Sequence, residues 1–252
     1  MTQNQLLILA AGKGTRMKSI GPKVLVPLNR KPLLRHILDS TAPLFPQPII
    51  IIGYKGELII RATKAKYDYV WQRKQLGTGH AIKVARSKLN KQDYSSIVII
   101  PGDDPLISLS SIRSLIKTQQ KNQAAVAVLT VKIKAEDELM THFDHFGRIL
   151  RSKNGKIVRI IEFKDASDDQ KNIGEFNLSC YCFNAKWLWD NIGALKNNNK
   201  AKEYYLTDMI ALAVDQKKKV VSAYAKNPIE GLGVNTIEQL KIVKNYLKAC
   251  QK

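Results

Sequence analysis

Runs of apolar residues separated by polar turns mark the N-terminal part of the chain. The runs cover 6–9, 48–53, 69–72 and 97–100. Short apolar runs of this kind predict strands that are buried on both faces. The segments between them predict helices over 32–40, 57–66 and 81–89. Strands that alternate with helices are typical of an α/β fold with a mainly parallel, doubly wound sheet.

The pattern changes after residue 123, where strands predominate. Strands are predicted over 124–133, 147–162, 176–183 and 220–224, and Asn154-Gly155 predicts a hairpin turn inside the second segment. Helices are predicted over 207–214 and over 237–249, the latter as a closing amphipathic helix. We find no low-complexity linker and no internal repeat. The two parts are therefore expected to merge into one continuous fold.

The composition is that of a globular chain with enough apolar residues for a substantial core. Its 252 residues are 44% hydrophobic, and no apolar run approaches the length of a membrane span. A short polar start leads directly into the first strand, so no signal peptide is expected. The three cysteines make no disulfide framework, and Cys180 and Cys182 alternate along a predicted strand as buried residues would. We therefore expect a cytoplasmic protein that does not bind membranes.

The net charge of +20 is the unusual feature of the composition. Lysines at 217–219, between 196 and 202, and at the C-terminus contribute to it. A solvated basic surface and an affinity for polyanions both explain such a surplus. No basic stripe interleaved with aromatic residues and no nucleic-acid motif is present. We favour the solvated surface and expect no specific nucleic-acid partner.

A glycine-containing loop follows the first strand. Residues 10–15 read Ala-Ala-Gly-Lys-Gly-Thr, where small side chains let backbone N–H groups approach an anion. Lys13, Arg16 and Lys23 add three cations, so the loop is a candidate phosphate cradle. Its spacing is neither that of a P-loop nor that of the dinucleotide-binding fingerprint. A tight turn with incidental lysines is the alternative interpretation.

The motif as a whole resembles the signature of nucleoside-diphosphate-sugar pyrophosphorylases. Residues 9–17 read Leu-Ala-Ala-Gly-Lys-Gly-Thr-Arg-Met, and Pro22-Lys23 follows. Enzymes of this family join a nucleoside triphosphate to a sugar 1-phosphate. The resemblance covers nearly the whole chain and implies a Rossmann-like doubly wound mixed sheet of the nucleotide-diphospho-sugar transferase type, with a β-rich sugar-binding half. It implies a single domain over 1–252, made of a nucleotide-binding half (1–123), a sugar-binding half (124–235) and a closing helix (236–252).

A candidate metal ligand, Asp103, follows the strand predicted over 97–100. Ligands of open α/β sheets sit beyond the carboxyl ends of strands, where a carboxylate can hold Mg²⁺ against triphosphate oxygens. Asp-Asp-Pro is also ordinary turn chemistry. The resemblance implies that Mg²⁺ is held by Asp103 together with Asn235, within Gly-Val-Asn. Asp104 is expected to point away or to contact the metal ligands from behind rather than the metal itself.

The segment 72–80 matches the part of the family that holds the uracil base. An amide and backbone groups can read the polar edge of uracil, although a helix start capped by Thr78 explains the same residues. His80 is expected to pack in the helix rather than act as a base. The nucleotide-binding residues that the resemblance implies are Ala10, Ala11, Gly12, Gly14, Thr15, Gln72, Gly77 and Thr78. The catalytic residues that it implies are Arg16, which steadies the departing pyrophosphate, and Lys23, which holds phosphate near the reacting centre.

The sugar-contacting residues of the family fall on four positions of this chain: Gly147, Glu162, Asn177 and Thr207. Side chains of Glu, Asn and Thr supply the donors and acceptors that sugar hydroxyls need. Close relatives usually carry Thr-Gly where this chain has Leu178-Ser179. His142 and His145 form an H-x-x-H pair without a third metal ligand in reach, and we interpret them as loop residues.

Two further segments, Lys-Asp-Ala at 164–166 and Glu-Tyr-Tyr-Leu-Thr-Asp at 203–208, resemble the N-acetylglucosamine-1-phosphate uridylyltransferase branch. The resemblance implies a Mg²⁺-dependent enzyme that makes UDP-N-acetylglucosamine and pyrophosphate from UTP and N-acetylglucosamine 1-phosphate. A pyrophosphorylase for another sugar 1-phosphate or nucleotide, such as a glucose 1-phosphate enzyme, and a non-catalytic nucleotide- or polyanion-binding module are the alternatives. Bifunctional relatives continue into a trimerising hexapeptide-repeat domain, so a monomer or weak dimer is expected here.

Overall fold

The computed structural model describes residues 3–14, 17, 21–89, 94–134 and 136–250. Its strands are β1 (Gln3–Ala10), β2 (Pro27–Leu28), β3 (Lys31–Pro32), β4 (Ile49–Ile52), β5 (Asp68–Trp71), β6 (Tyr94–Pro101), β7 (Val126–Lys132), β8 (Arg148–Arg151), β9 (Ile157–Ile161), β10 (Glu175–Asn184) and β11 (Val220–Tyr224). Its helices are α1 (Leu33–Thr41), α2 (Gly56–Ala62), α3 (Thr78–Leu89), α4 (Leu109–Lys121), α5 (Asp168–Lys171), α6 (Ala185–Asn191), α7 (Asp208–Asp215) and α8 (Ile237–Ala249).

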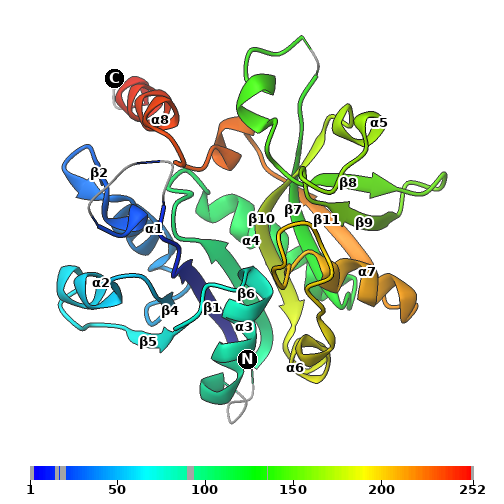
Figure 1. Ribbon diagram of the computed structural model, residues 1–252, viewed down its shortest axis with the longest axis horizontal. Helices are drawn as coiled ribbons and strands as arrows, with labels where there is room; N and C mark the ends of the chain where they lie inside the picture. The colour runs from blue at the N-terminus through cyan, green and yellow to red at the C-terminus, as the bar shows by residue number, and fades with distance from the viewer. Residues whose placement is uncertain (1–2, 15–16, 18–20, 90–93, 135, 251–252) are drawn as a thin grey trace.

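One mixed sheet runs through the molecule (Figure 1). Its main order is β11-β7-β10-β6-β1-β4-β5, and the β8–β9 hairpin is attached to β10. β1 pairs in parallel with β4 and β6, β4 with β5, and β7 with β11. β10 is antiparallel to both β6 and β7 and joins the two parallel parts. The prediction of a mixed α/β sheet is confirmed.

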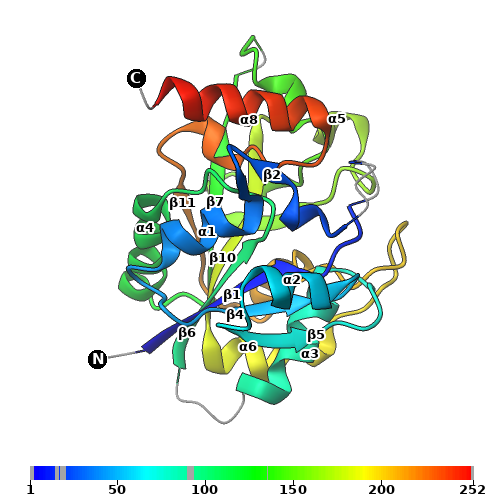
Figure 2. The same ribbon diagram turned by 90° about the vertical axis from the view of Figure 1, so that its left-hand side faces the viewer.

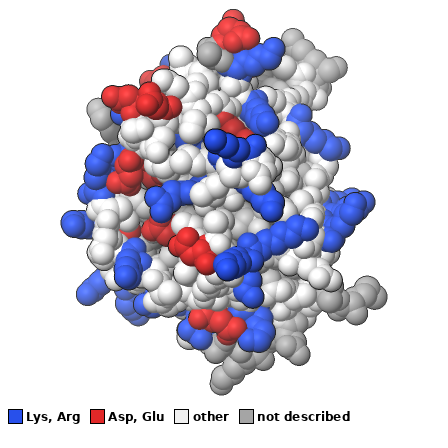
Figure 3. Space-filling model, turned by 90° about the vertical axis from the view of Figure 1, so that its right-hand side faces the viewer, with Lys and Arg blue, Asp and Glu red and all other residues white. Residues whose placement is uncertain are grey.

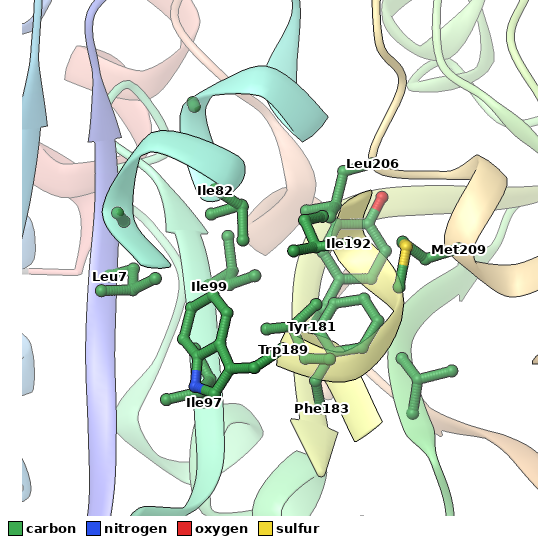
Figure 4. Packing of buried hydrophobic residues seen from close by; sticks show 14 of the residues in the cluster. Leu7, Ile82, Ile97, Ile99, Tyr181, Phe183, Trp189, Ile192, Leu206 and Met209 are labelled. Atoms are coloured by element: carbon green, nitrogen blue, oxygen red, sulfur yellow. The ribbon is translucent and has the colours of Figure 1, made fainter. Parts of the chain in front are cut away.

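The two faces of the sheet each pack against helices, which explains the apolar runs. Along β1, Leu7 belongs to one buried cluster while Leu6 and Ile8 belong to the other. The first cluster includes residues of α3, α6 and α7, and the second includes residues of α1, α2 and α4. Figure 4 shows the first cluster, where Ile99 of β6 lies near Ile82 of α3 and Trp189 of α6. A strand covered on both sides has no polar face, so alternation is absent from its sequence.

The predicted elements differ from the structure mainly in helices. The helix predicted over 57–66 ends at Ala62, because Lys64 and Ala65 adopt left-handed φ angles of 54° and 52° that a helix cannot contain. The helix α4 was not predicted from the sequence. The serine at its start was a usable signal, because Ser108 caps the helix by accepting a hydrogen bond from the N–H of Ser111 at 3.1 Å. α5 and α6 were not predicted either. The β8–β9 hairpin turns at 152–156, as Asn154-Gly155 predicts.

The C-terminal segment returns to the N-terminal part of the molecule. The N–H of Val234 donates to the carbonyl oxygen of Asp103 at 2.9 Å. α8 then begins with a capping box between Thr236 and Gln239 and packs over a small cluster that includes Met17 and Leu33. Figure 2 shows α8 lying above α1 and β2. None of the helices within the described residues is long and apolar enough to cross a membrane.

Candidate functional site

A cavity of about 510 Å³ opens where β1, β5 and β6 end. Its lining comes from both parts of the chain. Of the residues that the sequence predicts, it contains Ala10, Ala11, Gly12, Lys23, Gln72, Gly77, Thr78, Asp103, Gly147, Glu162, Asn177 and Asn235. Parallel strands expose their carboxyl ends at the same edge, so the loops after them converge there.

Lys23, Asp103 and Asn235 meet at one point of this cavity. The Lys23 ammonium forms an ion pair with the carboxylate of Asp103 and donates a hydrogen bond to Oδ1 of Asn235 at 2.7 Å. The side chains of Lys23 and Asp103 are only 15% and 16% exposed. A carboxylate oxygen and an amide oxygen thus converge on a positive charge, as they would on a magnesium ion. The donor set fits the metal site that the sequence predicts.

Asp104 lies beside this point and does not turn away from the cavity. It is buried, lines the cavity, and leaves no room for a side chain at Gly233, whose added Cβ would lie 2.3 Å from its Oδ1. Burial, and secondarily the charge of Asp103, raise the pKa of the Asp104 carboxyl well above its usual range, against the opposing effect of Lys23. Of the two alternatives expected for Asp104, pointing away is wrong, because the carboxyl packs against Gly233 and lines the cavity. The other alternative, a place behind the predicted ligands, fits this position.

Gln72, which the sequence predicts to contact the base, is a buried amide in the cavity lining. Its Nε2 donates to the carbonyl oxygen of Gly77 at 3.0 Å and to Nδ1 of His80 at 3.1 Å. Burial first, and then the charge of Lys83, lower the pKa of His80, which favours the neutral ring that can accept this bond. Both amide hydrogens of Gln72 are thereby directed into the protein, and its oxygen remains the atom that can meet a ligand. His80 positions Gln72 rather than acting as a base.

The loop before α3 is joined to the segment that precedes α7. The N–H of Tyr204 donates to Leu76 and the N–H of Gly79 donates to Tyr204, both at 2.8 Å. The hydroxyl of Thr78 accepts from the N–H of Leu206 at 3.1 Å, so it links the two segments. Gly77 has φ of 101°, and a Cβ there would lie 2.6 Å from the carbonyl oxygen of Tyr204. Only glycine fits this junction.

The predicted sugar-binding side chains are held by other side chains. Thr207 lies outside the cavity lining, but its hydroxyl donates to Glu162 at 2.9 Å. Nδ2 of Asn177 donates to the hydroxyl of Tyr181 at 2.7 Å, and its Oδ1 accepts from the N–H of Ser179 at 3.1 Å. Burial raises the pKa of Glu162 despite the hydrogen bond from Thr207. These groups form a preorganised polar wall.

Arg148 shapes the loop beside that wall. Its side chain is almost completely buried, and it forms no ion pair with a carboxylate of the described residues. It donates to the carbonyl oxygens of Phe143, Asp144, Phe146 and Lys171. Its guanidinium also lies 4.6 Å from the ring centroid of Phe176. Burial lowers the pKa of Arg148, against the opposing charge of Asp144. One cation thus fixes the course of the 143–146 loop.

Some predicted residues lie elsewhere, and other lining residues escaped prediction. Thr15 and Arg16 lie outside the described residues. Gly14 is not in the lining and instead packs against Lys23. The lining residues that sequence reasoning missed include His142, His145, Glu203, Thr236 and Gln239, whereas Gln75 and Ser179 belong to segments that the sequence already assigned to the site. The Thr-x-x-Gln capping box was a usable signal for Thr236 and Gln239, because Gln239 accepts from the N–H of Asn235 at 2.8 Å.

Residues 6–205 match the model of the MobA-like NTP transferase domain. The chain is 36% identical to the bifunctional protein GlmU of Brevibacillus brevis, over 98% of this chain and 52% of that protein. It is 39% identical to the bifunctional protein GlmU of Streptococcus uberis, over 97% of this chain and 52% of that protein. The chain therefore spans about half the length of these curated relatives.

Two solved structures share the fold. A UDP-glucose pyrophosphorylase complexed with UDP-glucose superimposes with a TM-score of 0.75 at 19% identity, covering 99% of both chains. A CMP:2-keto-3-deoxy-manno-octonic acid synthetase complexed with CTP gives a TM-score of 0.71 at 14% identity, covering 98% of this chain and 99% of the other. At these identities the similarity concerns the arrangement of helices and strands.

Proposed function

The chain belongs to the MobA-like NTP transferase family, and on that premise we propose that it transfers uridylyl from UTP to N-acetylglucosamine 1-phosphate, forming UDP-N-acetylglucosamine and pyrophosphate. The similarity to GlmU proteins at 36% and 39% identity and the resemblance of the 164–166 and 203–208 segments to the uridylyltransferase branch support this substrate pair. The chain acts in the proposal as one unit with a nucleotide-binding half (1–123) and a sugar-binding half (124–235).

One observation carries the proposal. Lys23, Asp103 and Asn235 are distant in sequence, with 212 positions between Lys23 and Asn235, yet they meet inside a cavity lined by both halves. A cation between a carboxylate and an amide at the ends of parallel strands suits the handling of phosphate groups and a divalent metal. The base-reading amide of Gln72 and the polar wall of Glu162 and Asn177 line the same cavity.

In the proposed reaction, an oxygen of the sugar 1-phosphate attacks the α-phosphorus of UTP in line and pyrophosphate leaves. Catalysis then consists of positioning and charge neutralisation. Backbone N–H groups of the glycine loop, with Arg16, steady the departing pyrophosphate, and Lys23 holds phosphate at the reacting centre. Asp103 and Asn235 would hold Mg²⁺, which supplies positive charge to the triphosphate oxygens when bound. Glu162, supported by Thr207, and Asn177 orient the sugar.

We also propose a cytoplasmic location. The three cysteines are unpaired and two of them are buried, as in proteins of reducing compartments.

The test measures pyrophosphate release over a panel of nucleoside triphosphates and sugar 1-phosphates. We expect UTP with N-acetylglucosamine 1-phosphate to give the highest kcat/KM, and Asp103→Asn and Asn235→Ala each to remove most turnover while circular dichroism stays unchanged. The exposed residues Asp169 and Asn245 provide matched controls as Asp169→Asn and Asn245→Ala. Preference for glucose 1-phosphate would overturn the substrate assignment, and near-normal turnover of either site variant would overturn the metal assignment.

A further inference from the structure

A second cavity, of about 850 Å³, lies between β9, β11 and the ends of α4 and α7. It shares no lining residue with the cavity described above. Its lining contains five cationic residues and neither Asp nor Glu: Arg151, Lys156, Lys217, Lys218 and Lys219. We call it the basic cavity. Figure 3 shows the side of the molecule that carries β8, β9 and α7, where Lys and Arg side chains spread widely and Asp and Glu gather in a few places.

The lysines of the basic cavity carry uncompensated charge. Arg151 is neutralised by Glu175, which accepts from its Nε at 2.7 Å and from its Nη2 at 2.6 Å. Within the part of the chain that the structure describes, no ion pair involves Lys156 or any lysine of 217–219. The C-terminal ends of α4 and α7 contribute roughly half a negative charge each. Four positive charges therefore outweigh about one negative charge.

The backbone that carries three of these lysines is fixed in place. Lys217 adopts φ of 56° after α7, its N–H donates to Val214 at 2.9 Å, and the N–H of Lys218 donates to Ala213 at 2.8 Å. This is the Schellman pattern of a helix end. The carbonyl oxygen of Lys219 accepts from the N–H of Ala125 at 2.9 Å, at the start of the pairing between β11 and β7. The charges are thus anchored on an ordered rim rather than on a loose loop.

Apolar residues also line the basic cavity. Val214, Val220 and Val158, which is 40% exposed, form what we call its valine floor, whereas Val221, the next residue of β11, lines the cavity from the opposite face of the sheet. The volume falls within the range of about 300–1,000 Å³ that is typical of small-molecule sites. No aromatic side chain lines the cavity, so the stacking platform of single-stranded nucleic-acid sites is missing from its lining. A small ligand whose anionic group contacts the lysines of the rim and whose apolar part contacts the valines fits these features better than a polymer does.

We propose that the basic cavity binds a small phosphorylated organic molecule, with its phosphate groups at Lys156 and Lys217–Lys219 and its apolar part on the valine floor. This site is separate from the proposed catalytic one and does not depend on the proposed function. Charge at a concave, partly apolar site is screened less than charge on an open surface, so binding should persist at physiological ionic strength.

The test is isothermal titration with ADP, pyrophosphate and adenosine in EDTA at about 0.15 M salt. The full chain is compared with a Lys217→Gln/Lys218→Gln/Lys219→Gln variant. The matched control is Lys241→Gln/Lys244→Gln/Lys248→Gln, which removes the same charge from exposed positions of α8. We expect wild type to bind ADP more tightly than pyrophosphate, and adenosine not to bind. The 217–219 variant should bind ADP at least about tenfold more weakly, and the control within about twofold of wild type.

Several results would overturn the proposal. They are absence of ADP binding to wild type, equal loss in both variants, or unchanged binding in the 217–219 variant. If a single-stranded oligonucleotide binds wild type more tightly than ADP does, and the 217–219 variant loses this binding, the surface is assigned to nucleic acid instead. Circular dichroism and thermal melting of the three proteins establish that the comparison is made between folded chains.

Discussion

The two halves of the cavity are built in different ways. On the side of the glycine loop, the lining includes the short residues Ala10, Ala11 and Gly12, whose small side chains leave the backbone after β1 open to a ligand. On the side of β8 to β10, the lining consists of long polar side chains that depend on partners, as Glu162 depends on Thr207. One side presents main chain, and the other presents a network of side chains.

This difference determines what damages each side. A backbone surface needs space, because the ligand must approach the chain itself, so an added methyl group is the harmful change. A buried polar wall needs its partners, because a group left without a hydrogen bond costs about 1–3 kcal/mol. We therefore expect the glycine-loop side to be damaged by substitutions that add atoms. We expect the polar-wall side to be damaged by substitutions that remove a hydrogen-bonding group.

The largest effect is expected from removing the guanidinium of Arg148, which supports the loop beside the polar wall. Arg148→Met leaves buried carbonyl oxygens of four residues without their donor, and we expect a loss of about 3–4 kcal/mol in the free energy of unfolding. Urea unfolding measures it. Arg159→Met, on the exposed side of β9, is the control and should stay within about 0.5 kcal/mol of wild type. A similar loss of unfolding free energy in Arg148→Met and Arg159→Met would show that the buried hydrogen bonds of Arg148 have no special effect.

Overfilling the glycine-loop side should harm turnover more than stability. Gly14 has φ of 64°, and a Cβ there would lie 2.5 Å from Cβ of Lys23. Gly14→Ala should displace Lys23 and lower kcat/KM for pyrophosphate release by about 10- to 100-fold, while the left-handed alanine costs about 1–2 kcal/mol. Gly193→Ala is the control, since a Cβ added there would have open space around it and the φ of Gly193 is not positive. Full activity of Gly14→Ala would contradict the placement of Lys23.

The buried carboxyl of Glu162 predicts a pH-dependent stability difference. Burial raises the pKa of the Glu162 carboxyl above the ordinary value of 4.5, so the folded state binds this proton more tightly than the unfolded state does. Ionisation therefore lowers stability as the pH rises from 4.5 through the raised pKa. Relative to Glu162→Gln, wild type should lose stability over this window and reach a constant difference above it. Urea unfolding between about pH 4 and about pH 8 measures this, with exposed Glu138→Gln as control.

The same Glu162→Gln variant should raise KM for the sugar 1-phosphate and leave KM for UTP unchanged. A pH-independent stability difference would show that the carboxyl is not desolvated in solution.

The smallest effect is expected at Ser179. This residue has φ of 52° at the irregularity between Asn177 and Tyr181 in β10, a backbone conformation that favours glycine. Ser179→Gly should relieve the left-handed strain and stabilise the chain by about 0.5–1 kcal/mol. Lys64→Gly, with φ of 54° on the surface, should gain a similar amount and isolates the backbone effect. The ratio of kcat/KM for N-acetylglucosamine 1-phosphate and glucose 1-phosphate should shift only in Ser179→Gly, by less than about tenfold.

The apolar runs were sufficient to predict the sheet, because strands covered on both faces leave a continuous signal. β4 and β11 lie within a residue or two of their predicted bounds, and α8 matches them fully. The resemblance to the pyrophosphorylase signature also implied that Asp103 and Asn235 share one metal ion and that Lys23 lies near the reacting phosphate, and these three side chains meet in the structure. Each of these residues follows a strand or belongs to the short Gly-Val-Asn segment, so a local sequence pattern identifies its position.

The polar wall was harder to anticipate, because it depends on contacts between distant segments. The burial of Arg148 was not anticipated, because arginine is usually exposed and this one is satisfied by the carbonyl oxygens of Phe143, Asp144, Phe146 and Lys171 rather than by a patterned partner. The same loop brings His142 and His145 to the cavity, although their spacing alone suggested only a loop. The left-handed Ser179 is set by the interrupted pairing of β10, which periodicity in the sequence does not reveal.

The return of the C-terminal segment to Asp103 has a consequence for how the protein is made. Asn235 is synthesised 212 residues after Lys23, which takes about 10–40 s at translation rates of about 5–20 residues per second. During that interval the glycine loop and the first parallel strands exist without the amide that completes the proposed metal site. On the proposed mechanism, a nascent or prematurely terminated chain that lacks Asn235 should therefore have no nucleotidyltransfer activity, and activity should arise only after the 233–235 segment has reached Asp103.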